Sequence, residues 1–496
     1  MIKNRSAIAN LTAGLVCLSA GYIWWSVLIY KYTHLSYDDW DLAFFTQSCW
    51  NLLHGSQFSS LVGINYFGDH SYFITYFYLP LFALFPHPLT LVFLKLAAFL
   101  FSAYLLFKIF HRKLNLPLSL GLMTAYLWLP ANIFAILYEF NPESLSMPFI
   151  ILTFDAFENR RWRTFWVSAV CLLLIKENFA LITAAFGIWG LLTAKDAAAK
   201  KQAGLLLAVS LIIFYILVEW LIPHFRQLPT HAFVVRYAYL GKSVGGIFIN
   251  ILLHPQMVLS HIFNLLNFRY MEYLFGVWLI PSMFGLPVLL IATPLWLQHF
   301  LSLHLPEHGI YSFYGMTMAP FIFLALYRAF TLNQRWIDSI WLHAVIFILL
   351  MLSMAQTLHF QREFIRRTDY YEDNSIPARW RMLDRIPPKE PVIATFNFLA
   401  PLSLREGLYS FHKVYDSYYQ LPELISKNEL NTQARFILPD NVRYALIDFS
   451  DNFIVQAMKN YPKFAKQRID WFLKGWRPLR HEGNVYLYVR NIPEQK

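Results

Sequence analysis

The sequence predicts a mainly α-helical, polytopic membrane protein with a small α/β domain at its carboxyl end. Of the 496 residues, 57% are hydrophobic and only 14% are charged, whereas about a quarter of a typical soluble domain is charged. Apolar runs close to the roughly 20 residues that cross a bilayer recur along the first 355 positions. After residue 358 charged residues become frequent and the long apolar runs stop. We therefore expect roughly nine to twelve spanning helices within 1–358 and a soluble domain over 359–496.

Composition also narrows the class of function. The net charge of +11 fits basic cytoplasmic loops and acidic lipid headgroups, so it does not indicate a nucleic-acid partner. The three cysteines are far apart and predict neither a disulfide framework nor a zinc site. The chain has no glycine-rich phosphate loop and no dinucleotide fingerprint, so we expect no nucleotide cofactor.

The order of basic and apolar segments predicts the topology. Lys3 and Arg5 place the amino terminus in the cytoplasm by the positive-inside rule. No small-residue cleavage site follows the first apolar run, so we expect a retained helix that leads to a large outer loop, about 31–70. Basic segments at 111–113, 158–163 and 194–201 then fall on the cytoplasmic side. The predicted spans are 11–30, 89–110, 117–137, a pair within 164–193 broken at 176–178, 204–222, a segment within 245–265, 277–300, 316–331 and 337–355.

The last part of the chain reads as an extracytoplasmic domain. Short runs such as "PVIATF", "YALIDF" and "NVYLYVR" are typical of strands and are separated by turn residues. The basic residues Arg362, Arg366 and Arg367 oppose the positive-inside rule here. That rule weakens for charges leading into a long translocated domain, so we keep this domain on the outer face.

The outer loop opens with an acidic stretch, "DDWDLAFFTQSCWNLLHG", at residues 38–55. Ionisable residues near membrane depth usually mark a functional site, because a charge within hydrocarbon costs about 2.5 kcal/mol or more. Taken alone, each of Asp38, Asp39 and Asp41 is better explained as a solvated loop residue, or as the cap of the short helix that follows.

Other polar residues fall on the same predicted face. Asp69 and His70 belong to "YFGDHSYF", and Glu139 and Glu143 belong to "YEFNPES". Alone, His70 is explained by a structural hydrogen bond, and the Lys176–Glu177 dipeptide by an ion pair at a helix break. Asp69, Glu139 and Glu143 could bind a divalent cation through their oxygens, although carboxylates on separate loops are a weak metal signal. The last such segment, "LPEHGIYSFYG", contains Glu307, His308, Tyr311 and Tyr314.

Taken in order, these motifs resemble a family of bacterial and archaeal membrane proteins, the DUF2079 family. The resemblance rests on "WDLAFFTQSCWNLLHG", "GDHSYFITYFYLPLFALFPHPLTLVFLK", "EFNPESLSMPFIIL" and "KENFALI", with "VIATFNFLAPLSLREGLYSF" in the carboxyl-terminal domain. That family in turn resembles the GT-C superfamily of integral-membrane glycosyltransferases, which use polyprenyl-phosphate sugars. Two positions depart from the family pattern, because Asn141 stands where His is usual and Asn178 stands where Asp is usual.

The resemblance implies a GT-C-like fold and a glycosyltransferase in the bacterial cytoplasmic (inner) membrane, with its carboxyl-terminal domain in the periplasm. A polyprenyl-phosphate donor would pass a hexosyl or pentosyl group to an unidentified glycan, lipid or protein acceptor, with inversion. Asp41 matches the family aspartate and is the expected general base, with Asp39 second. A base at that position would take the acceptor proton, and cations at the same depth would stabilise the departing phosphate. The expected substrate- or phosphate-binding residues are Gln47, Trp50, Asn51, His70, Lys176, Glu177, His308 and Tyr314.

Two other classes of function stay open. A transporter or flippase for a lipid or small solute could use Lys176 and Glu177 as a relay, since carriers have broken helices and ionisable pairs at mid-membrane. The absence of an internal repeat and the concentration of polar residues on one face favour the enzyme. A non-catalytic assembly protein with a transferase fold is the third class, and the Asn141 and Asn178 departures are compatible with it.

Overall fold

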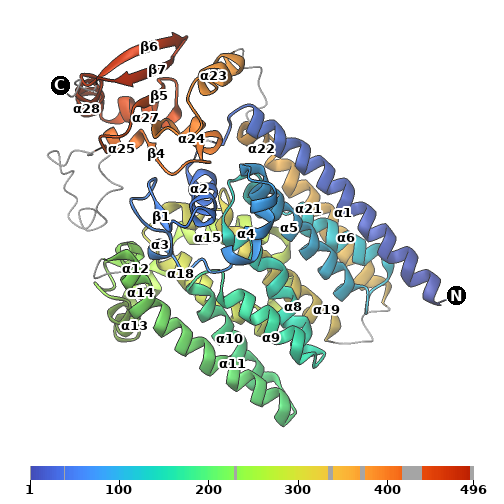
Figure 1. The fold of residues 1–496 in the computed structure, drawn as a ribbon. Helices are drawn as coiled ribbons and strands as arrows, with labels where there is room; N and C mark the ends of the chain where they lie inside the picture. Colours follow the sequence, from blue (N-terminus) through green and yellow to red (C-terminus); the bar gives the residue numbers. More distant parts are fainter. Residues whose placement is uncertain are drawn as a thin grey trace.

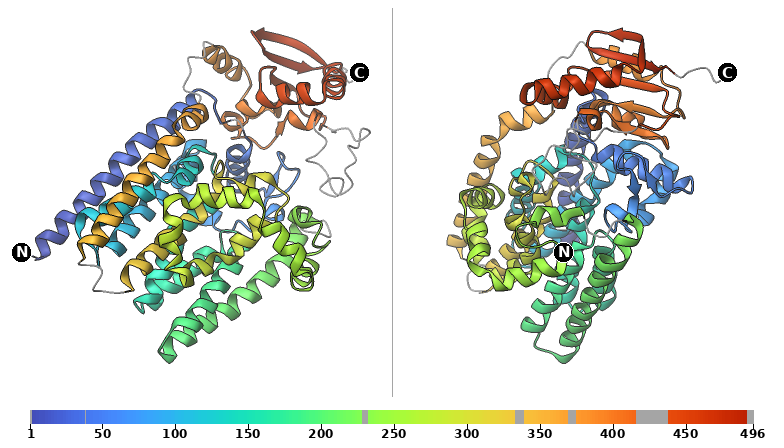
Figure 2. Two further views of the ribbon diagram at one scale, coloured as in Figure 1. Left: turned by 180° about the vertical axis from the view of Figure 1, so that it is seen from behind. Right: turned by 90° about the vertical axis from the view of Figure 1, so that its left-hand side faces the viewer.

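The computed structural model describes residues 2–37, 39–227, 232–332, 339–368, 375–415 and 438–491. They form a helix bundle that carries a five-stranded sheet at one end (Figure 1). The views from behind and from the side place the amino terminus away from that sheet (Figure 2). The predicted fold class, a helix bundle with a small sheet domain, is confirmed.

Two long antiparallel helices, α1 (Ile2–Thr33) and α5 (Pro88–Phe110), form one side of the bundle. Lys108 Nζ donates to Asn10 Oδ1 at 3.1 Å at one end of the pair, and the Tyr32 and His87 rings lie 4.9 Å apart at the other. The chain between them forms the first loop, which contains α2 (Asp41–Leu53), β1 (Phe58–Ser59), β2 (Ile64–Asn65), α3 (Tyr66–Asp69) and α4 (Thr75–Leu84).

Within the described residues, five helices are long and apolar enough to cross a membrane, or up to seven if each of two bent pairs is one span. The bends are 47° between α6 and α7 and 96° between α13 and α14. The predicted nine to twelve spans are reached only if shorter apolar helices also lie in the membrane. The helices are α6 (Leu116–Leu127), α7 (Pro130–Leu137), α8 (Ser146–Glu158), α9 (Trp162–Leu173), α10 (Asn178–Thr193), α11 (Ala197–Tyr215), α12 (Ile222–Arg226), α13 (Val244–Leu253), α14 (Pro255–Ile262), α15 (Leu265–Phe275), α16 (Leu279–Met283), α17 (Leu286–Leu289), α18 (Thr293–Leu301), α19 (Ala319–Thr331), α21 (Ile340–His359) and α22 (Gln361–Thr368).

The prediction of one continuous span over 277–300 is wrong. The segment breaks between α16 and α17, and the stretch Leu286–Leu301, which contains α17 and α18, is one shorter apolar helix. Pro287 lies in the first turn of α17. Proline cannot donate to the preceding turn, so it favours the start of a new helix over continuation. Gly285 lies at the break and packs against α19, where an added Cβ would stand 2.1 Å from the Ala325 carbonyl oxygen.

Polar residues selected from the sequence lie close to one another in the structure. The charges of Asp39, Asp69 and Lys176 all act on Asp41, and Lys176 pairs with Glu143. The basic turns after α5 and α8 make separate contacts, because Arg112 and Arg161 both pair with Asp155.

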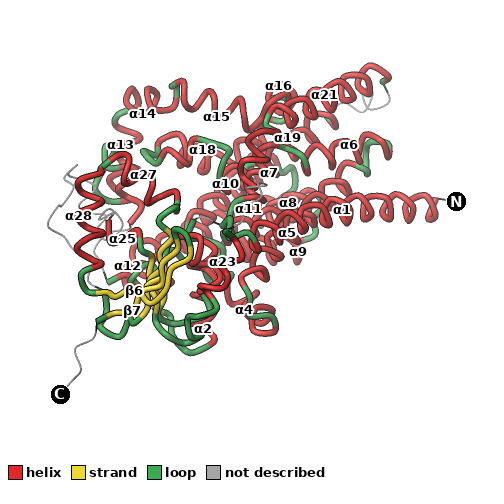
Figure 3. The backbone as a smooth tube through the Cα atoms, turned by 90° about the horizontal axis from the view of Figure 1, so that it is seen from above, coloured by secondary structure: helices red, strands yellow, loops and turns green. Residues whose placement is uncertain are grey.

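The carboxyl-terminal sheet has the strand order β4-β3-β5-β7-β6. β3 is parallel to both of its neighbours, and Ile393 lies opposite Tyr409 and Ala445, whereas β7 is antiparallel to β5 and β6. The strands expected at "PVIATF", "YALIDF" and "NVYLYVR" are confirmed, and Figure 3 shows the strands gathered in one sheet beside the helices. The elements are β3 (Val392–Ala394), β4 (Leu408–Ser410), β5 (Tyr444–Asp448), β6 (Trp476–Glu482) and β7 (Val485–Arg490), with helices α23 (Ile376–Leu383), α24 (Phe396–Leu402), α25 (His412–Tyr415), α27 (Asn452–Asn460) and α28 (Pro462–Leu473).

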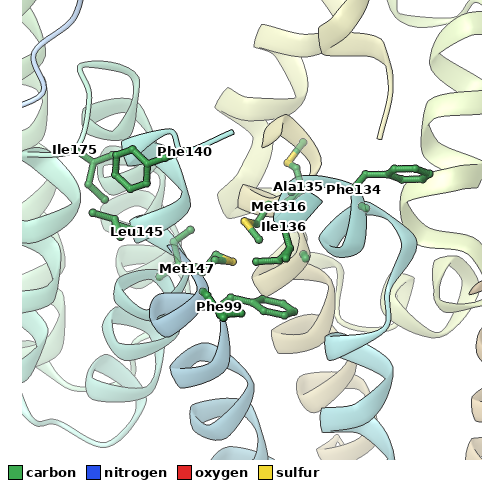
Figure 4. Close-up of a cluster of buried hydrophobic side chains, with 14 of the residues drawn as sticks. Phe99, Phe134, Ala135, Ile136, Phe140, Leu145, Met147, Ile175 and Met316 are labelled. Carbon is green, nitrogen blue, oxygen red and sulfur yellow. The ribbon is translucent and has the colours of Figure 1, made fainter. Parts of the chain in front are cut away.

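A buried hydrophobic cluster supports the polar loops at this end of the bundle. Phe140 and Ile175 are fully buried and lie close together, with Leu145 beside them (Figure 4). Phe140 stands between Glu139 and Asn141 in the chain, and Ile175 directly precedes Lys176. Burial of such side chains is worth about 1.5–3 kcal/mol each, which fixes the backbone that presents the neighbouring polar groups.

Candidate functional site

The amino end of α2 is capped by a carboxylate from a distant part of the chain. Glu139 Oε1 accepts a hydrogen bond from the Asp39 N–H at 2.9 Å, and Oε2 accepts from the Leu42 N–H at 2.6 Å. The first N–H groups of a helix lack partners within it and favour negative charge. The capping group is thus Glu139, and not Asp39 as the sequence suggested, because Trp40 occupies the cap position. Asp38 lies outside the described residues.

The two described aspartates of the opening stretch contact the loop after α7. The Tyr138 hydroxyl donates to Asp39 Oδ2 at 2.6 Å, and the Asn141 side chain hydrogen-bonds to Asp41. Burial and the neighbouring Asp39 charge raise the pKa of Asp41 well above that of an ordinary carboxyl, while the Asn141 bond opposes this rise. Asp41 therefore takes up a proton more readily than a solvated aspartate does.

A buried lysine holds this loop in place. Lys95 is fully buried on α5, and its Nζ donates to the carbonyl oxygens of Ile136 at 2.8 Å and Tyr138 at 2.6 Å. It also contacts the carbonyl oxygens of Ala135 and Glu139, at 3.1 Å and 3.3 Å. The last carbonyls of a helix lack partners within it and favour a cation, so Lys95 fixes the end of α7 and the two residues that contact Asp39.

A second polar group comes from the break between α9 and α10. Lys176 Nζ pairs with Glu143 Oε1 at 2.7 Å, and both side chains are buried. His70 Nδ1 lies 2.5 Å from Glu177 Oε1, and the Ser71 N–H donates to the other oxygen of that carboxylate at 3.2 Å. The positive charge of Lys176 also acts on Asp41, where it lowers the pKa. The two polar groups are therefore electrostatic neighbours.

A large cavity of about 940 Å³ opens beside Lys176. Its walls are mostly apolar residues of α10, α11, α13 and α18, and one part of the wall carries His70, Lys176, Arg236 and Glu307. Arg236 pairs with Glu307, whose Oε2 is buried and has no hydrogen-bond partner among the described residues. An apolar cavity with charged groups concentrated in one place suits an amphipathic ligand.

Asp39 of the opening stretch lines a second, smaller cavity of about 460 Å³. Asp39, Tyr138 and Glu139 line it, together with Lys31 at the end of α1 and residues of α22 and α27. Asp41 is coupled to a residue of each cavity, because the charges of both Asp39 and Lys176 act on its pKa. Asp39 lines this polar cavity, whereas Asp41 belongs to neither lining and is linked to both cavities by charge alone.

Several motif residues hold α2 in place and do not line either cavity. Gln47 is fully buried, and its Nε2 donates to Ser60 Oγ at 2.7 Å and to the Glu406 carbonyl at 2.9 Å. Asn51 Nδ2 donates to the Phe58 carbonyl at 2.8 Å, and Trp50 packs on the following turn with its ring 4.1 Å from that of His54. Gly55 ends this turn with a φ of +81°, which strains any residue with a side chain.

The remaining predicted residues belong to the segment before α19. Tyr314 packs near the apolar cavity, and its hydroxyl lies 3.4 Å from Arg236 Nη1. Both ring nitrogens of His308 are engaged by the protein, with Asn267 Oδ1 at 2.6 Å and the Ser302 carbonyl at 2.7 Å. His308 therefore fixes the loop that carries Glu307.

The three carboxylates that the sequence suggested as metal ligands do not come together in the structure. Across the described ranges, no three or more His, Cys, Asp or Glu side chains form a group that could hold a metal ion. Glu139 is used to cap α2 and Glu143 to pair with Lys176, so these carboxylates do not converge with Asp69 on one point. We therefore assign no metal role to Asp69, Glu139 or Glu143.

The sequence analysis did not select three residues that belong to the site: Lys95, Tyr138 and Arg236. Lys95 carries a signal, because a lone lysine within an apolar span usually has a role. Tyr138 begins the motif "YEFNPES" but was not selected within it, and nothing in the neighbourhood of Arg236 in the chain distinguishes it from the other basic residues. Their roles depend on Asp39 and Glu307, which lie 99 and 71 residues away.

Comparison with known proteins agrees with this architecture. A family model described as "Predicted membrane protein (DUF2079)" matches residues 31–444, whereas no curated protein matches the chain. The crystal structure of ArnT from Cupriavidus metallidurans bound to undecaprenyl phosphate is similar, with a TM-score of 0.50 and 12% identity over 97% of this chain and 98% of that one. The archaeal oligosaccharyltransferase AglB from Archaeoglobus fulgidus, in complex with an inhibitory peptide and a dolichol-phosphate, gives a TM-score of 0.44 and 9% identity over 97% and 75%. The resemblance to the DUF2079 family and to the GT-C fold is thus confirmed.

Proposed function

We propose that this chain, which belongs to the DUF2079 family of predicted membrane proteins, is an integral-membrane glycosyltransferase that uses a polyprenyl-phosphate sugar. The observation that carries the proposal is the contact of the two aspartates with the loop after α7. Asp39 lines the polar cavity and bonds to Tyr138, while Asp41 bonds to Asn141 and is affected by the charge of Lys176, which lines the apolar cavity. A transferase of this kind needs a base between a lipid-linked donor and an acceptor. We place this site on the extracytoplasmic face of a bacterial inner membrane.

The apolar cavity is the proposed donor site. The polyprenyl chain would lie along α10, α11 and α13, and the phosphate would contact Lys176 and Arg236, which line that cavity. Charge-assisted hydrogen bonds from such cations stabilise a phosphate, and more so the phosphate that leaves with an additional charge. The similar ArnT structure holds undecaprenyl phosphate, which supports a ligand of this chemical class.

The donor sugar would lie between the phosphate and Asp41. Glu307 Oε2 and Asn178 Oδ1 are buried acceptors without hydrogen-bond partners among the described residues, and both residues line the apolar cavity. Buried acceptors without partners are costly, and sugar hydroxyls would satisfy them. Asn178 Nδ2 donates to Gln298 Oε1 at 2.9 Å, which fixes the amide in this orientation.

The proposed reaction is a single displacement. The acceptor hydroxyl oxygen attacks the anomeric carbon from the face opposite the phosphate, and the bond between that carbon and the phosphate oxygen breaks. The electron pair of the broken bond leaves with the polyprenyl phosphate, and the hydroxyl proton passes to the Asp41 carboxylate. Asp39, held by Tyr138, increases the basicity of Asp41. Gln47, Trp50 and Asn51 act as positioning residues for α2.

The pH dependence of transfer should respond to the neighbours of Asp41. A base works only when it is ionised, so activity falls as the pH drops through the raised pKa of Asp41. Asp39→Asn removes the repulsive charge, lowers that pKa and should move the acid limb of kcat/KM to lower pH. Asn141→Ala removes a bond that stabilises the ionised form and should move the limb to higher pH. Shifts in the same direction in both variants would contradict this role of Asp41.

Blocking the apolar cavity tests the donor site. We expect saturable binding of undecaprenyl phosphate to the protein in nanodiscs. Ala185→Trp should lose much of this affinity, because Ala185 lines the cavity and the larger side chain would occupy it. Ala7→Trp is the matched control, because Ala7 is exposed on α1 and does not line the cavity. Equal binding by both variants would contradict the donor site. Binding without turnover of any sugar donor would instead support a carrier or an assembly protein.

A further inference from the structure

The proposed donor occupies the apolar cavity and leaves the polar cavity for another ligand. The cavity volume of about 460 Å³ falls within the roughly 300–1,000 Å³ of typical small-molecule sites. On the side next to α2, Glu139 uses both oxygens on backbone N–H groups and Asp39 accepts from Tyr138. The two carboxylates of the lining are therefore held by contacts within the protein.

The other charged residues of the lining are basic. Lys31, Arg366 and Arg367 line the cavity, and Lys31 Nζ donates to the Arg367 carbonyl at 2.7 Å, which ties the end of α1 to α22. The two arginines share one carboxylate, Glu363, at 2.6 Å and 3.2 Å. The lining thus brings three basic side chains together, two of them arginines. Guanidinium groups bind phosphate and carboxylate with good geometry.

Aromatic and amide side chains complete the cavity. Lys31 lies over the Tyr37 ring at 5.3 Å, and Arg367 lies over the Tyr311 ring at 5.9 Å, contacts that hold both cations in place. From α27 of the carboxyl-terminal domain, Asn452 and Gln456 contribute side chains to the lining. Aromatic faces and amides suit the apolar faces and hydroxyls of sugars, so this cavity combines sugar-binding groups with an anion-binding wall.

We propose that this cavity binds the acceptor, and that the acceptor is a saccharide carrying an anionic group, either phosphate or carboxylate. The anion would contact Lys31, Arg366 and Arg367, and a hydroxyl of the saccharide would point toward Asp39 and Asp41. This inference rests on the proposed function, because it gives the second substrate of that reaction its place beside the base. It also assigns a role to α27, which lines the site from the carboxyl-terminal domain.

The test uses three probes of similar size: glucose 6-phosphate, glucuronate and methyl glucoside. Their equilibrium binding to the protein in nanodiscs is measured without turnover. We expect the dissociation constants of the anionic probes to be lower than that of the neutral probe by a factor of about ten or more. The double variant Arg366→Gln with Arg367→Gln should lose about tenfold or more of the anionic affinity. Arg362→Gln on the same helix is the matched control, since Arg362 is exposed and outside the lining.

Each outcome of this test is decisive. Binding of the phosphate probe alone identifies a phosphorylated acceptor, and binding of both anionic probes identifies a site for either anion. Equal binding of methyl glucoside, or unchanged anionic affinity in the double variant, overturns the inference. Undecaprenyl phosphate binding is measured on the same samples and should be unaffected by the double variant. Its absence in the wild type would overturn the donor proposal whatever the saccharides do.

Discussion

Asp41→Asn should abolish sugar transfer while leaving donor binding unchanged. The substitution keeps the shape of the side chain, including its ability to bond with Asn141, and removes only the capacity to accept a proton. Loss of a positioned general base typically lowers the rate about 10²- to 10⁴-fold. The measurement is the single-turnover release of polyprenyl phosphate from a labelled donor, together with the dissociation constant for undecaprenyl phosphate.

A matched substitution separates loss of the base from a general effect of the change. Asp470 lies exposed on α28, so Asp470→Asn should transfer at the wild-type rate. Full transfer by Asp41→Asn would contradict the assignment of the base. If transfer were instead lost only in Asp39→Asn, the base would be the other aspartate of the stretch, which lines the polar cavity directly.

Lys176→Met should both destabilise the protein and weaken donor binding. Lys176 and Glu143 form a buried pair at 2.7 Å, and removal of one partner leaves a buried charge alone, which typically costs about 3–5 kcal/mol. In the double variant Lys176→Met with Glu143→Leu, the pair is replaced by apolar side chains, which is often close to neutral for stability. The double variant should therefore regain most of the unfolding free energy.

Donor binding should not return with the stability. A phosphate that loses its charge-assisted bond to Lys176 should bind about 10- to 100-fold more weakly in both variants. Lys108→Met provides the control, because Lys108 lies on α5 near the other end of the bundle and bonds to Asn10. A double variant that is both stable and fully able to bind undecaprenyl phosphate would show that Lys176 serves only the fold.

The sequence predicted the elements whose patterns are local. Long apolar runs with basic flanks indicated α1, α5 and α21, and β-rich runs between turns indicated β3, β5 and β7. The helix pair α9 and α10 was expected because a lysine and a glutamate interrupt an apolar run. The segment 277–300 was predicted wrongly because hydropathy alone does not register the break at Gly285 and Pro287.

The predictions of individual roles succeeded less often, because those roles depend on distant partners. Glu139 was selected as a possible metal ligand, whereas its oxygens cap a helix that begins 98 residues earlier. Gln47 belongs to a family motif, yet its amide bonds to the carbonyl of Glu406 in the carboxyl-terminal domain. Asn141, a departure from the family pattern, bonds to Asp41. No spacing in the sequence encodes these pairs.

We propose that the protein releases polyprenyl phosphate from a lipid-linked sugar, with Asp41 as the general base. The most direct measurement incubates the protein in nanodiscs with a panel of labelled polyprenyl-phosphate sugars and follows the release of polyprenyl phosphate, with Asp41→Asn and Asp470→Asn beside the wild type. We expect release from at least one donor by the wild type and by Asp470→Asn, and none by Asp41→Asn. Saturable donor binding with no release from any member of the panel, or equal release by all three proteins, would contradict it.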